Sequence, residues 1–573
     1  MTTYKNLLKK HRVKIIWSPI LVLIFVICET TQPYFMSLII DQGIMVNDWT
    51  TITKVGIAMI GISLISLVAN LLNIYISSQV SVQFGTDLRN QLFNKIQTFS
   101  LKDIDQFQPS TLITRLTNDI SMIQRVVLML LRIFLRAPLM LIFAFLFIIK
   151  INPSLSIIVL IGILILAISI AVILKFAFPL FTKTQEKLDQ LNRVIQENLN
   201  NIRVVKAFAK EEVEINKFQK SNIEHRDVIL KAWDILVCAY PLMQLIINTS
   251  IIVVLWIGGN RVMNDHMQVG ELIAIINYFV QILMALMMLS FTIMGFARAM
   301  ASSKRIKEVL HFTPSIVDNT NNNNQQICKG SIEFREVNLH YSNEDEGVLN
   351  EVSFYITPGE TVAIVGATGS GKSSLLNLIP RLYDATSGDI FIDGKKIKDY
   401  SKKALRDQIG VVFQVNDLFT GSIAENLRWG NLNASQEELE KAAKMAEAHS
   451  FILDLEKGYE TQIGRGGINL SGGQRQRICI ARALLSQPKI LLLDDCTSAV
   501  DASTEKKIWR NLSYRNNDMT TLIVTQRIHT LNAVHRVIVM DEGTVVAFDT
   551  PQKLIKTSKA YQELFYSQIN INS

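Results

Sequence analysis

The chain has 573 residues, of which 49% are hydrophobic and only 19% are charged, and its mean hydropathy is +0.25. A soluble protein of this size carries more charge, so the composition excludes a wholly soluble enzyme. The net charge of +8 does not indicate nucleic acid, because the basic residues gather beside apolar runs, as they do at an anionic membrane surface. The five cysteines are scattered, odd in number and without CxxC spacing, so neither a disulfide framework nor a zinc site is expected.

Six apolar runs are long enough to cross a bilayer as helices, which takes about 20 residues each. Short polar stretches separate the first run from the second, the third from the fourth and the fifth from the sixth. Much longer polar stretches separate the second from the third and the fourth from the fifth. The runs lie at Ile15–Ile40, Val55–Ser77, Val126–Ile149, Leu155–Phe178, Ile235–Gly258 and Leu272–Phe296.

The two long separators also have a helical pattern. Gln83–Phe99 and Glu186–Lys206 carry apolar residues at three- and four-residue spacing, with few helix breakers. We therefore expect membrane helices that continue well past the bilayer on one side. Met1–Lys14 holds five lysines and arginines and no acidic residue, which places the N-terminus in the cytoplasm. With six spans, the helix extensions and everything after the last run then also lie in the cytoplasm.

The rest of the chain changes character. We expect a membrane domain at 1–312 and a linker at 313–330, because this stretch contains four consecutive asparagines and no apolar periodicity. From 331 to 573 short β-branched runs alternate with helical segments, as in an α/β domain. The expected fold is an α-helical six-span membrane domain followed by an α/β nucleotide-binding domain.

A complete phosphate-binding loop defines the second domain. Gly366–Ser373 reads Gly-Ala-Thr-Gly-Ser-Gly-Lys-Ser, follows the strand Thr361–Val365 and opens the helix Ser374–Ile379. Glycines let backbone N–H groups converge on phosphate oxygens, and the helix N-terminus adds positive potential. We expect ATP to be bound by Gly366, Thr368, Gly369, Ser370, Gly371, Lys372, Ser373 and Ser374.

Two of these residues have further roles in such loops. Lys372 contributes a charge to the β- and γ-phosphates, and Ser373 contributes a hydroxyl to Mg²⁺. Asp494, at the end of the apolar strand Ile490–Asp494, is expected to hold the Mg²⁺ shell. ATP and Mg²⁺ are therefore the expected cofactors.

A third motif lies between the loop and Asp494 and reads Leu470, Ser471, Gly472, Gly473, Gln474. Together the three motifs make the chain resemble the ATP-binding-cassette (ABC) transporters over essentially its whole length. The six-span layout with long cytoplasmic extensions resembles the exporter type. This resemblance implies that Tyr341 stacks on adenine and that Gln414 contacts Mg²⁺ and faces the membrane domain. Ser498 and Asp501 match the D-loop.

The resemblance also implies an assembly. In this family two cassettes close head to tail over two ATP molecules, so Leu470–Gln474 serves a nucleotide bound mainly by a partner. A chain with six spans and one cassette is a half-transporter and must dimerise. The short helices that couple the cassettes to the membrane domain are expected near Leu101–Phe107 and Ala209–Ile215.

Two positions depart from the family pattern. Asp495 replaces the glutamate that polarises the attacking water, and Gln526 replaces a histidine that contacts the γ-phosphate. The aspartate is one methylene shorter, and such a misplacement can cost about 100-fold in rate, or nearly 3 kcal/mol. We therefore expect a site that binds ATP but is impaired in hydrolysis, although slow hydrolysis with Asp495 remains an alternative.

The signature Leu470–Gln474 is intact, which favours a nonidentical partner that supplies its own glutamate and histidine, as in heterodimeric bacterial multidrug exporters. The expected function is ATP-driven export of apolar or amphipathic compounds across the cell membrane. Two alternatives stay open: an exporter-shaped importer of a metal chelate, and a regulatory ATP-binding membrane protein that moves no substrate itself. Glu29 interrupts the first run and could contact a cationic substrate or pair within the bundle.

Overall fold

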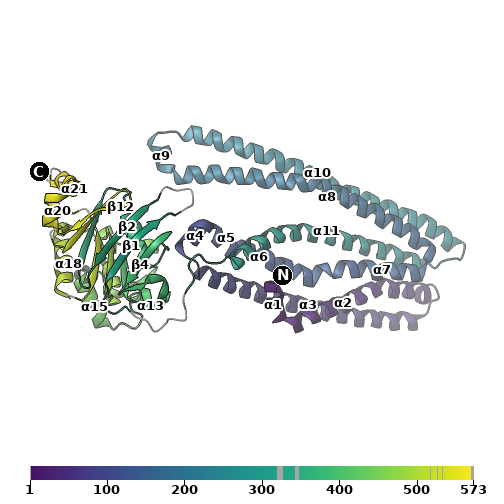
Figure 1. Cartoon of the computed structure of the whole chain (residues 1–573). Helices are drawn as coiled ribbons and strands as arrows, with labels where there is room; N and C mark the ends of the chain where they lie inside the picture. The colour runs from purple at the N-terminus through teal and green to yellow at the C-terminus, as the bar shows by residue number, and fades with distance from the viewer. Residues whose placement is uncertain are drawn as a thin grey trace. The chain divides into compact units, whose positions relative to one another are not determined.

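The computed structural model describes residues 2–318, 327–341, 347–515, 518–525, 527–531 and 533–569. The chain divides into two compact units (Figure 1). The first is built from Met1–Gln97 and Ser110–Phe312, and the second from Thr98–Pro109 and Thr313–Ser573. The second unit thus includes a short segment from within the expected membrane domain 1–312.

The first unit is helical throughout the part that the structure describes. Its helices are α1 (Thr2–Lys9), α2 (Arg12–Leu38), α3 (Trp49–Gln97), α5 (Pro109–Thr114), α6 (Ile120–Met129), α7 (Arg136–Ile151), α8 (Pro153–Asn200), α9 (Ile202–Ala207), α10 (Glu211–Met263) and α11 (Val269–His311). Three π-helical turns continue or link these helices, namely η1 (Ile39–Ile44), η2 (Arg115–Asp119) and η3 (Leu130–Phe134).

Among the described residues, six helical stretches are long and apolar enough to cross a membrane, and they overlap the six predicted runs. The prediction of six membrane helices is confirmed. Helices α3, α8 and α10 have 49, 48 and 53 residues. At 1.5 Å per residue each is about 70–80 Å long, against about 30 Å for the hydrocarbon core of a bilayer. The predicted continuation of helices beyond the apolar runs is also confirmed.

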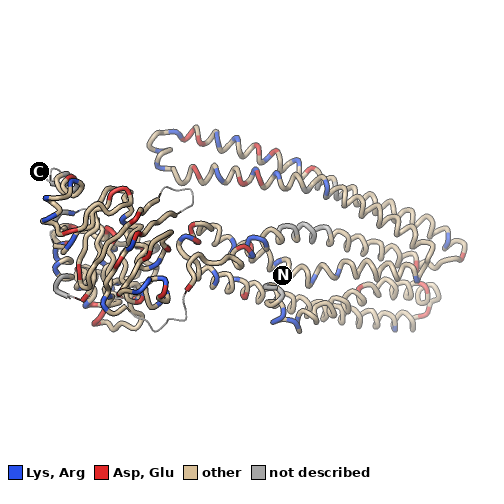
Figure 2. Tube along the Cα trace, viewed as in Figure 1, with Lys and Arg blue, Asp and Glu red and all other residues tan. Residues whose placement is uncertain are grey.

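Most charged residues of α8 and α10 lie in the part of each helix that extends beyond its apolar run. Figure 2 shows acidic and basic residues along the parts of both helices that lead to α9, whereas the opposite parts are almost free of charge. Ion pairs join the two helices in the charged part, for example Lys187–Glu224 at 2.7 Å and Lys217–Glu197 at 2.9 Å. The charged part is suited to water and the uncharged part to lipid.

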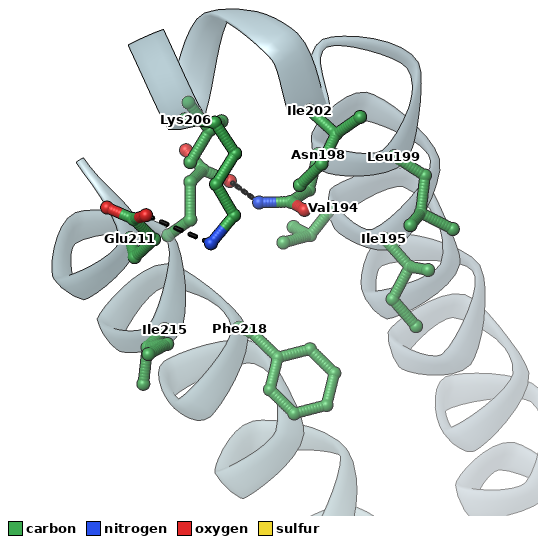
Figure 3. A pocket seen from close by; sticks show the side chains of 11 residues that line it. Val194, Ile195, Asn198, Leu199, Ile202, Lys206, Glu211, Ile215 and Phe218 are labelled. Carbon is green, nitrogen blue, oxygen red and sulfur yellow. Dashed lines mark hydrogen bonds and ion pairs between the residues drawn. The ribbon is translucent and has the colours of Figure 1, made fainter. Parts of the chain in front are cut away.

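The second short helix is not where the sequence suggested. The expectation of a helix at Ala209–Ile215 is wrong, because α9 ends at Ala207 and α10 begins at Glu211. Ala209 has a φ of 46°, which stops the helix, and three acidic residues in the first turn of α10 favour a new helix N-terminus. Apolar and polar side chains of α8, α9 and α10 line a pocket of about 310 Å³ at this end of the hairpin (Figure 3).

The second unit contains the described strands, which form three sheets. A six-stranded sheet has the order β12-β11-β3-β10-β9-β6, a four-stranded sheet has the order β2-β1-β4-β5, and β7 pairs with β8. In the larger sheet only β12 is antiparallel to its neighbour. The strands are β1 (Ile332–Leu339), β2 (Leu349–Ile356), β3 (Thr361–Gly366), β4 (Ser387–Ile392), β5 (Lys395–Lys396), β6 (Ile409–Val412), β7 (Gly421–Ser422), β8 (Gln462–Ile463), β9 (Ile490–Asp494), β10 (Thr520–Val524), β11 (Arg536–Asp541) and β12 (Thr544–Asp549).

Helices accompany these sheets. They are α4 (Leu101–Phe107), α12 (Lys372–Leu378), α13 (Lys402–Arg406), α14 (Ile423–Arg428), α15 (Gln436–Met445), α16 (His449–Leu453), α17 (Gly472–Leu485), α18 (Ala502–Arg515), α19 (Ile528–Leu531), α20 (Pro551–Thr557) and α21 (Lys559–Ile569), with 3₁₀ turns η5 (Ile397–Asp399), η6 (Gly458–Glu460) and η7 (Arg465–Gly467).

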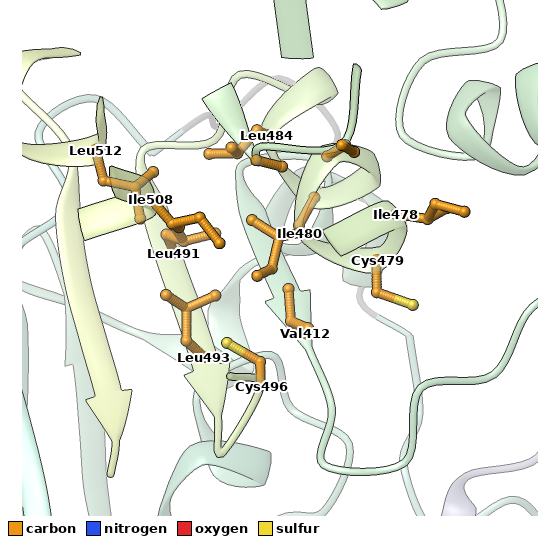
Figure 4. Packing of buried hydrophobic residues seen from close by; sticks show 14 of the residues in the cluster. Val412, Ile478, Cys479, Ile480, Leu484, Leu491, Leu493, Cys496, Ile508 and Leu512 are labelled. Carbon is orange, nitrogen blue, oxygen red and sulfur yellow. The ribbon is translucent and has the colours of Figure 1, made fainter. Parts of the chain in front are cut away.

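Both faces of the six-stranded sheet are buried. Successive residues of β9 alternate between two apolar clusters, so Leu491 and Leu493 join one, and Ile490 and Leu492 join the other. Figure 4 shows Leu491 and Leu493 among side chains of α17 and α18. Because β3, β9 and β10 are parallel, their carboxyl ends lie at one edge of this buried sheet. Ligands bind at that edge in such folds.

Candidate nucleotide-binding site

The phosphate-binding loop has the strand–loop–helix context that its sequence predicts. It connects the end of β3 to the start of α12, and Gly369 and Gly371 have φ values of 88° and 92°. These values favour glycine because a Cβ is poorly accommodated there. A Cβ on Gly371 would also lie 2.8 Å from the carbonyl oxygen of Val348. The loop backbone is thus free to face a ligand without side chains in the way.

Lys372 lies against the loop. Its ammonium group donates hydrogen bonds to the carbonyl oxygens of Gly366 at 3.0 Å and Ala367 at 2.6 Å and to the Ser370 hydroxyl at 3.3 Å. Burial lowers the pKa of Lys372, and the nearby carboxylates of Asp494 and Asp495 oppose this shift. The positive charge is therefore fixed at the mouth of the helix, where it can pair with phosphate.

Two consecutive carboxylates follow from β9. Asp494 is the last residue of the strand, and burial raises its pKa, opposed by a hydrogen bond from Ser373 and by the charge of Lys372. Asp495 comes next with a φ of 45°, and its backbone N–H donates to the Val524 carbonyl oxygen at 3.1 Å. Burial and then the charge of Asp494 raise the pKa of Asp495. Two crowded, partly desolvated carboxylates favour a bound cation.

A cavity of about 640 Å³ joins these groups. Most of the predicted ATP and Mg²⁺ residues line it, together with four residues that were not predicted as site residues, Val348, Val524, Thr525 and Arg527. The lining consists of Val348, Thr368, Gly369, Gly371, Lys372, Ser373, Ser374, Gln414, Asp494, Asp495, Ser498, Val524, Thr525 and Arg527. Of the other predicted site residues, Gly366 and Ser370 belong to the same loop, whereas Tyr341, Asp501 and Leu470–Gln474 lie outside this lining.

The side chains in this cavity fit Mg²⁺ and a nucleotide phosphate. Magnesium prefers oxygen ligands, and the Ser373 hydroxyl, the Gln414 amide oxygen and the Asp494 carboxylate are oxygen donors that line one space. Backbone N–H groups of a glycine-rich loop, a helix N-terminus and Lys372 suit the phosphate oxygens. The arrangement can bind a nucleotide with its cation at the edge of the sheet.

The predicted signature forms the N-terminus of α17. Ser471 is the N-cap: its hydroxyl accepts from the Gln474 N–H at 3.2 Å, while the Gln474 side chain accepts from the Ser471 N–H at 2.9 Å. This capping box leaves the first turn rigid. A Cβ on Gly473 would lie 2.7 Å from the Ala499 carbonyl oxygen, so glycine is needed for close approach. Ser471 is exposed, and none of the residues Leu470–Gln474 lines the chain's own nucleotide cavity.

Gln476 connects the signature helix to the predicted D-loop. Its amide nitrogen donates to the Ser498 hydroxyl at 3.0 Å, and its amide oxygen accepts from the Ala499 N–H at 2.9 Å. Asp501 ends the loop by accepting from the Ser503 hydroxyl at 2.7 Å and the Thr504 N–H at 2.9 Å. Two hydrogen bonds of Gln476 therefore join the signature helix to the D-loop.

Comparison with known proteins agrees with these motifs. Residues 15–286 match the family described as the ABC transporter transmembrane region, and residues 349–498 match the family described as ABC transporter. The uncharacterized ABC transporter ATP-binding protein YfiB of Bacillus subtilis is 41% identical over 96% of this chain and 95% of its own length. The chain belongs to the ABC transporter family.

Other relatives of this ABC transporter have names that state an activity. The ATP-dependent lipid A-core flippase of Desulfotalea psychrophila is 31% identical, covering 94% of each chain. The putative multidrug export ATP-binding/permease protein YgaD of Bacillus subtilis is 31% identical over 85% of this chain and 84% of its own length. The shared architecture is that of an exporter-type ABC transporter, with a multi-pass membrane region and an ATP-binding domain.

In this ABC transporter Tyr341 lies beside the phosphate loop rather than in its cavity. Its hydroxyl bonds to the Ser374 hydroxyl at 2.9 Å, and its ring packs edge-on against Tyr383 at 4.9 Å. The Tyr383 hydroxyl donates to the Asp105 carboxylate of α4 at 3.1 Å. Helix α4 has the predicted bounds Leu101–Phe107, so the second unit links the expected adenine platform to this helix through one tyrosine.

Sequence reasoning missed the interactions of Arg527. Arg527 donates to the D-loop carbonyl oxygens of Ser498 at 2.9 Å and Val500 at 3.2 Å, and it pairs with the fully buried Glu505. A basic residue directly after Gln526 was the available signal, but its partners lie far along the chain. Gln526 itself lies outside the described residues.

Proposed function

We propose that this chain is one half of a heterodimeric ATP-driven exporter of apolar or amphipathic compounds, and that its own ATP site is impaired for hydrolysis. The names of the flippase and multidrug export relatives support an amphipathic substrate. ATP with Mg²⁺ binds at the cavity that Lys372 and Asp494 line, with adenine on Tyr341. The intact signature serves the ATP of a nonidentical partner.

The observation that carries the proposal is Asp495, which lines the nucleotide cavity where the family has a glutamate. Its carboxylate is one methylene shorter, and its own backbone N–H donates to the Val524 carbonyl oxygen of β10, which holds the backbone of Asp495 at the end of the sheet. A misplacement of about 1 Å can cost about 100-fold in rate. Gln526 can donate a hydrogen bond but can carry neither a proton nor a positive charge.

The asymmetry gives each site a different role. The partner's phosphate loop, glutamate and histidine meet Leu470–Gln474 and form the hydrolytic site. The site based on Lys372 and Asp495 retains ATP and keeps the cassettes partly closed. ATP binding turns the membrane cavity outward, and hydrolysis at the partner-based site resets it. The partner's own signature is free to differ from the family pattern.

The test uses the purified pair in which the partner's catalytic glutamate is replaced by glutamine and the partner's signature is set to Leu-Ser-Gly-Gly-Gln, so that only the proposed degenerate site can turn over and its signature is complete. Asp495→Glu with Gln526→His should raise ATP turnover at least tenfold, as expected when a misplaced carboxylate is restored. Asp494→Glu is the matched control, since it lengthens the neighbouring Mg²⁺ ligand and should give no rise. An unchanged rate in the restored variant, or brisk hydrolysis by this chain paired with itself, would overturn the proposal.

Direction and topology need a separate experiment. We place the N-terminus and the ATP-binding domain in the cytoplasm of a cell-membrane protein, because Met1–Lys14 is basic. In inside-out vesicles an exporter accumulates substrate when ATP is added outside. ATP-dependent depletion of preloaded vesicles would instead indicate an importer.

A further inference from the structure

Polar side chains from three different helices lie within the candidate membrane spans of the first unit and close to one another. Glu29 is on α2, Arg136 opens α7, and Gln281 is on α11. The hydrocarbon core of a bilayer cannot hydrogen-bond such groups, so they must meet other protein groups, water or a ligand. Their surroundings therefore indicate what they bind.

The three residues converge on one apolar cluster. Helices α2, α7 and α11 pack against one another, and each contributes to a cluster that contains Phe25, Ala137 and Ala285. Each of these three lies within about one helical turn of a polar residue on the same helix. The Arg136 guanidinium carbon lies 4.2 Å from the centre of the Phe25 ring, and the Gln281 amide nitrogen lies 3.5 Å from the backbone oxygen of Glu29.

These polar groups are not satisfied within the part of the chain that the structure describes. The Arg136 Nε atom and the Gln281 Oε1 atom are buried without a hydrogen-bond partner. The Glu29 carboxylate and Arg136 interact electrostatically but form no ion pair within 4.0 Å among the described residues. A buried polar group without a hydrogen-bond partner destabilises the fold, and such groups are rare unless they meet water or a ligand.

Neighbouring polar groups of the bundle do not share this feature. The Thr30 hydroxyl donates to the Val26 carbonyl oxygen at 2.8 Å, and the Tyr278 hydroxyl donates to the Thr30 carbonyl oxygen at 2.7 Å. On α2 the Gln32 amide nitrogen donates to the Ser63 hydroxyl at 2.9 Å. Among the described residues of α2, α7 and α11, the buried side-chain atoms without a hydrogen-bond partner are Arg136 Nε and Gln281 Oε1.

We propose that Glu29, Arg136 and Gln281 bind the head group of a zwitterionic amphiphile that carries a phosphate and an ammonium group. This inference rests on the proposed export of amphipathic compounds and names the substrate class. The Arg136 guanidinium donates to the phosphate, and the Glu29 carboxylate and the Gln281 amide oxygen accept from the ammonium. The apolar cluster around Phe25 packs against the hydrocarbon chain of the amphiphile.

The distance between the positive charge of Arg136 and the negative charge of Glu29 suits a single ligand that carries one negative and one positive group. Phe25, beneath Arg136, lies four residues before Glu29, which is about 6 Å along α2. A phosphate and an ammonium joined by two carbons can span such a distance. Arg132 lies one turn before Arg136 and interacts with it electrostatically, so it adds positive charge on the phosphate side.

The test measures equilibrium binding of acyl-labelled probes to the full-length transporter, assembled as it is in the membrane and reconstituted in lipid nanodiscs. The probes share one chain and carry a phosphoethanolamine, a phosphate or an amine head group. The phosphoethanolamine probe should bind at least tenfold more tightly than the other two. Arg136→Gln should weaken the phosphoethanolamine and phosphate probes about tenfold and leave the amine unchanged.

The complementary variants keep the result interpretable. Glu29→Gln should weaken the phosphoethanolamine and amine probes and leave the phosphate probe unchanged, and Gln281→Leu should follow the same pattern more weakly. Gln32→Leu, whose amide is already bonded within the chain, is the matched control and should change none. Equal losses for all three probes would indicate a packing defect and overturn the proposal.

A change in subunit pairing would also test the proposed head-group site. If Glu29→Gln or Arg136→Gln weakens subunit pairing and leaves head-group preference intact, the open groups serve the partner subunit, and the proposal is wrong. Probe binding needs no ATP turnover, so it can succeed when the restored catalytic variant fails, and the reverse. The two proposals are therefore distinguishable.

Discussion

Replacing Glu505 by alanine tests the buried junction beside the nucleotide site. The Glu505 side chain on α18 is fully buried and accepts hydrogen bonds from Thr497 at 3.0 Å, Trp509 at 3.1 Å and Thr530 at 3.0 Å. It also forms an ion pair with Arg527, which donates a hydrogen bond to the Ser498 carbonyl oxygen of the D-loop. Alanine removes the shared acceptor of the D-loop, α18 and the segment after β10 at once.

The expected cost follows from burial. Removing one partner of a buried ion pair costs about 3–5 kcal/mol. The Arg527 side chain is 31% exposed and can turn toward water, so the lower value, about 3 kcal/mol, applies. For a domain of about 200 residues, 1 kcal/mol shifts the Tm by about 2–4 °C, so Glu505→Ala should lower the Tm by about 6–12 °C. Scanning fluorimetry of the full-length chain in detergent measures this shift.

Two further variants decide whether the reasoning is sound. Glu440→Ala on α15 removes a carboxylate whose side chain is 36% exposed and should change stability by no more than about 0.5 kcal/mol. In Glu505→Ala/Arg527→Ala, the second change should cost at least about 1 kcal/mol less than it does alone, because its partner is already absent. Additive effects of the two substitutions, or a Tm drop of less than 2 °C in Glu505→Ala, would refute a buried junction.

Two other predictions concern the same domain. In Gly473→Ala the new Cβ would lie 2.7 Å from the Ala499 carbonyl oxygen and push the D-loop aside. ATP turnover of the pair should therefore fall at least tenfold, while this chain's own ATP affinity, measured with a fluorescent analogue, stays unchanged. Equal losses of turnover and affinity would contradict this prediction. Asp393 accepts from the backbone N–H groups of Cys328 to Ser331 at 2.8–2.9 Å. Although burial alone would raise the pKa of Asp393, these donors lower it overall. A lowered carboxyl pKa stabilises the fold above about pH 4 and loses this effect as the pH falls through the folded-state pKa. The Tm advantage of the wild type over Asp393→Asn should therefore be full at pH 7 and shrink below about pH 4; a pH-independent difference would show that the carboxylate charge is not responsible.

Much of the molecule follows from local chemistry in the sequence. The six apolar runs and the strand Ile490–Asp494 lie where the pattern predicted them, because hydrophobic periodicity acts over a few neighbouring residues. The short helix Leu101–Phe107, which the family resemblance implied, also has its expected bounds. The phosphate loop is equally local. A run of eight residues specifies its fold and its ligand chemistry.

The interactions between distant segments were not predictable in this way. Arg527 contacts Ser498 and Glu505, which lie 29 and 22 residues before it in the sequence. Tyr383 contacts Asp105, which lies 278 residues before it. Each partner alone reads as an ordinary charged or aromatic residue. The second short helix was misplaced for a related reason, since a single left-handed residue, Ala209, separates α9 from α10.

By itself the sequence determined that this protein spans a membrane six times and binds a nucleotide through a defined loop, because both properties depend on composition and on contiguous motifs. Only the tertiary structure decided which side chains share a cavity with Asp495, which residues hold the D-loop, and which polar groups of the bundle remain unsatisfied. Those outcomes depend on packing between segments far apart in the chain, where burial and the removal of water set the energy of each charge.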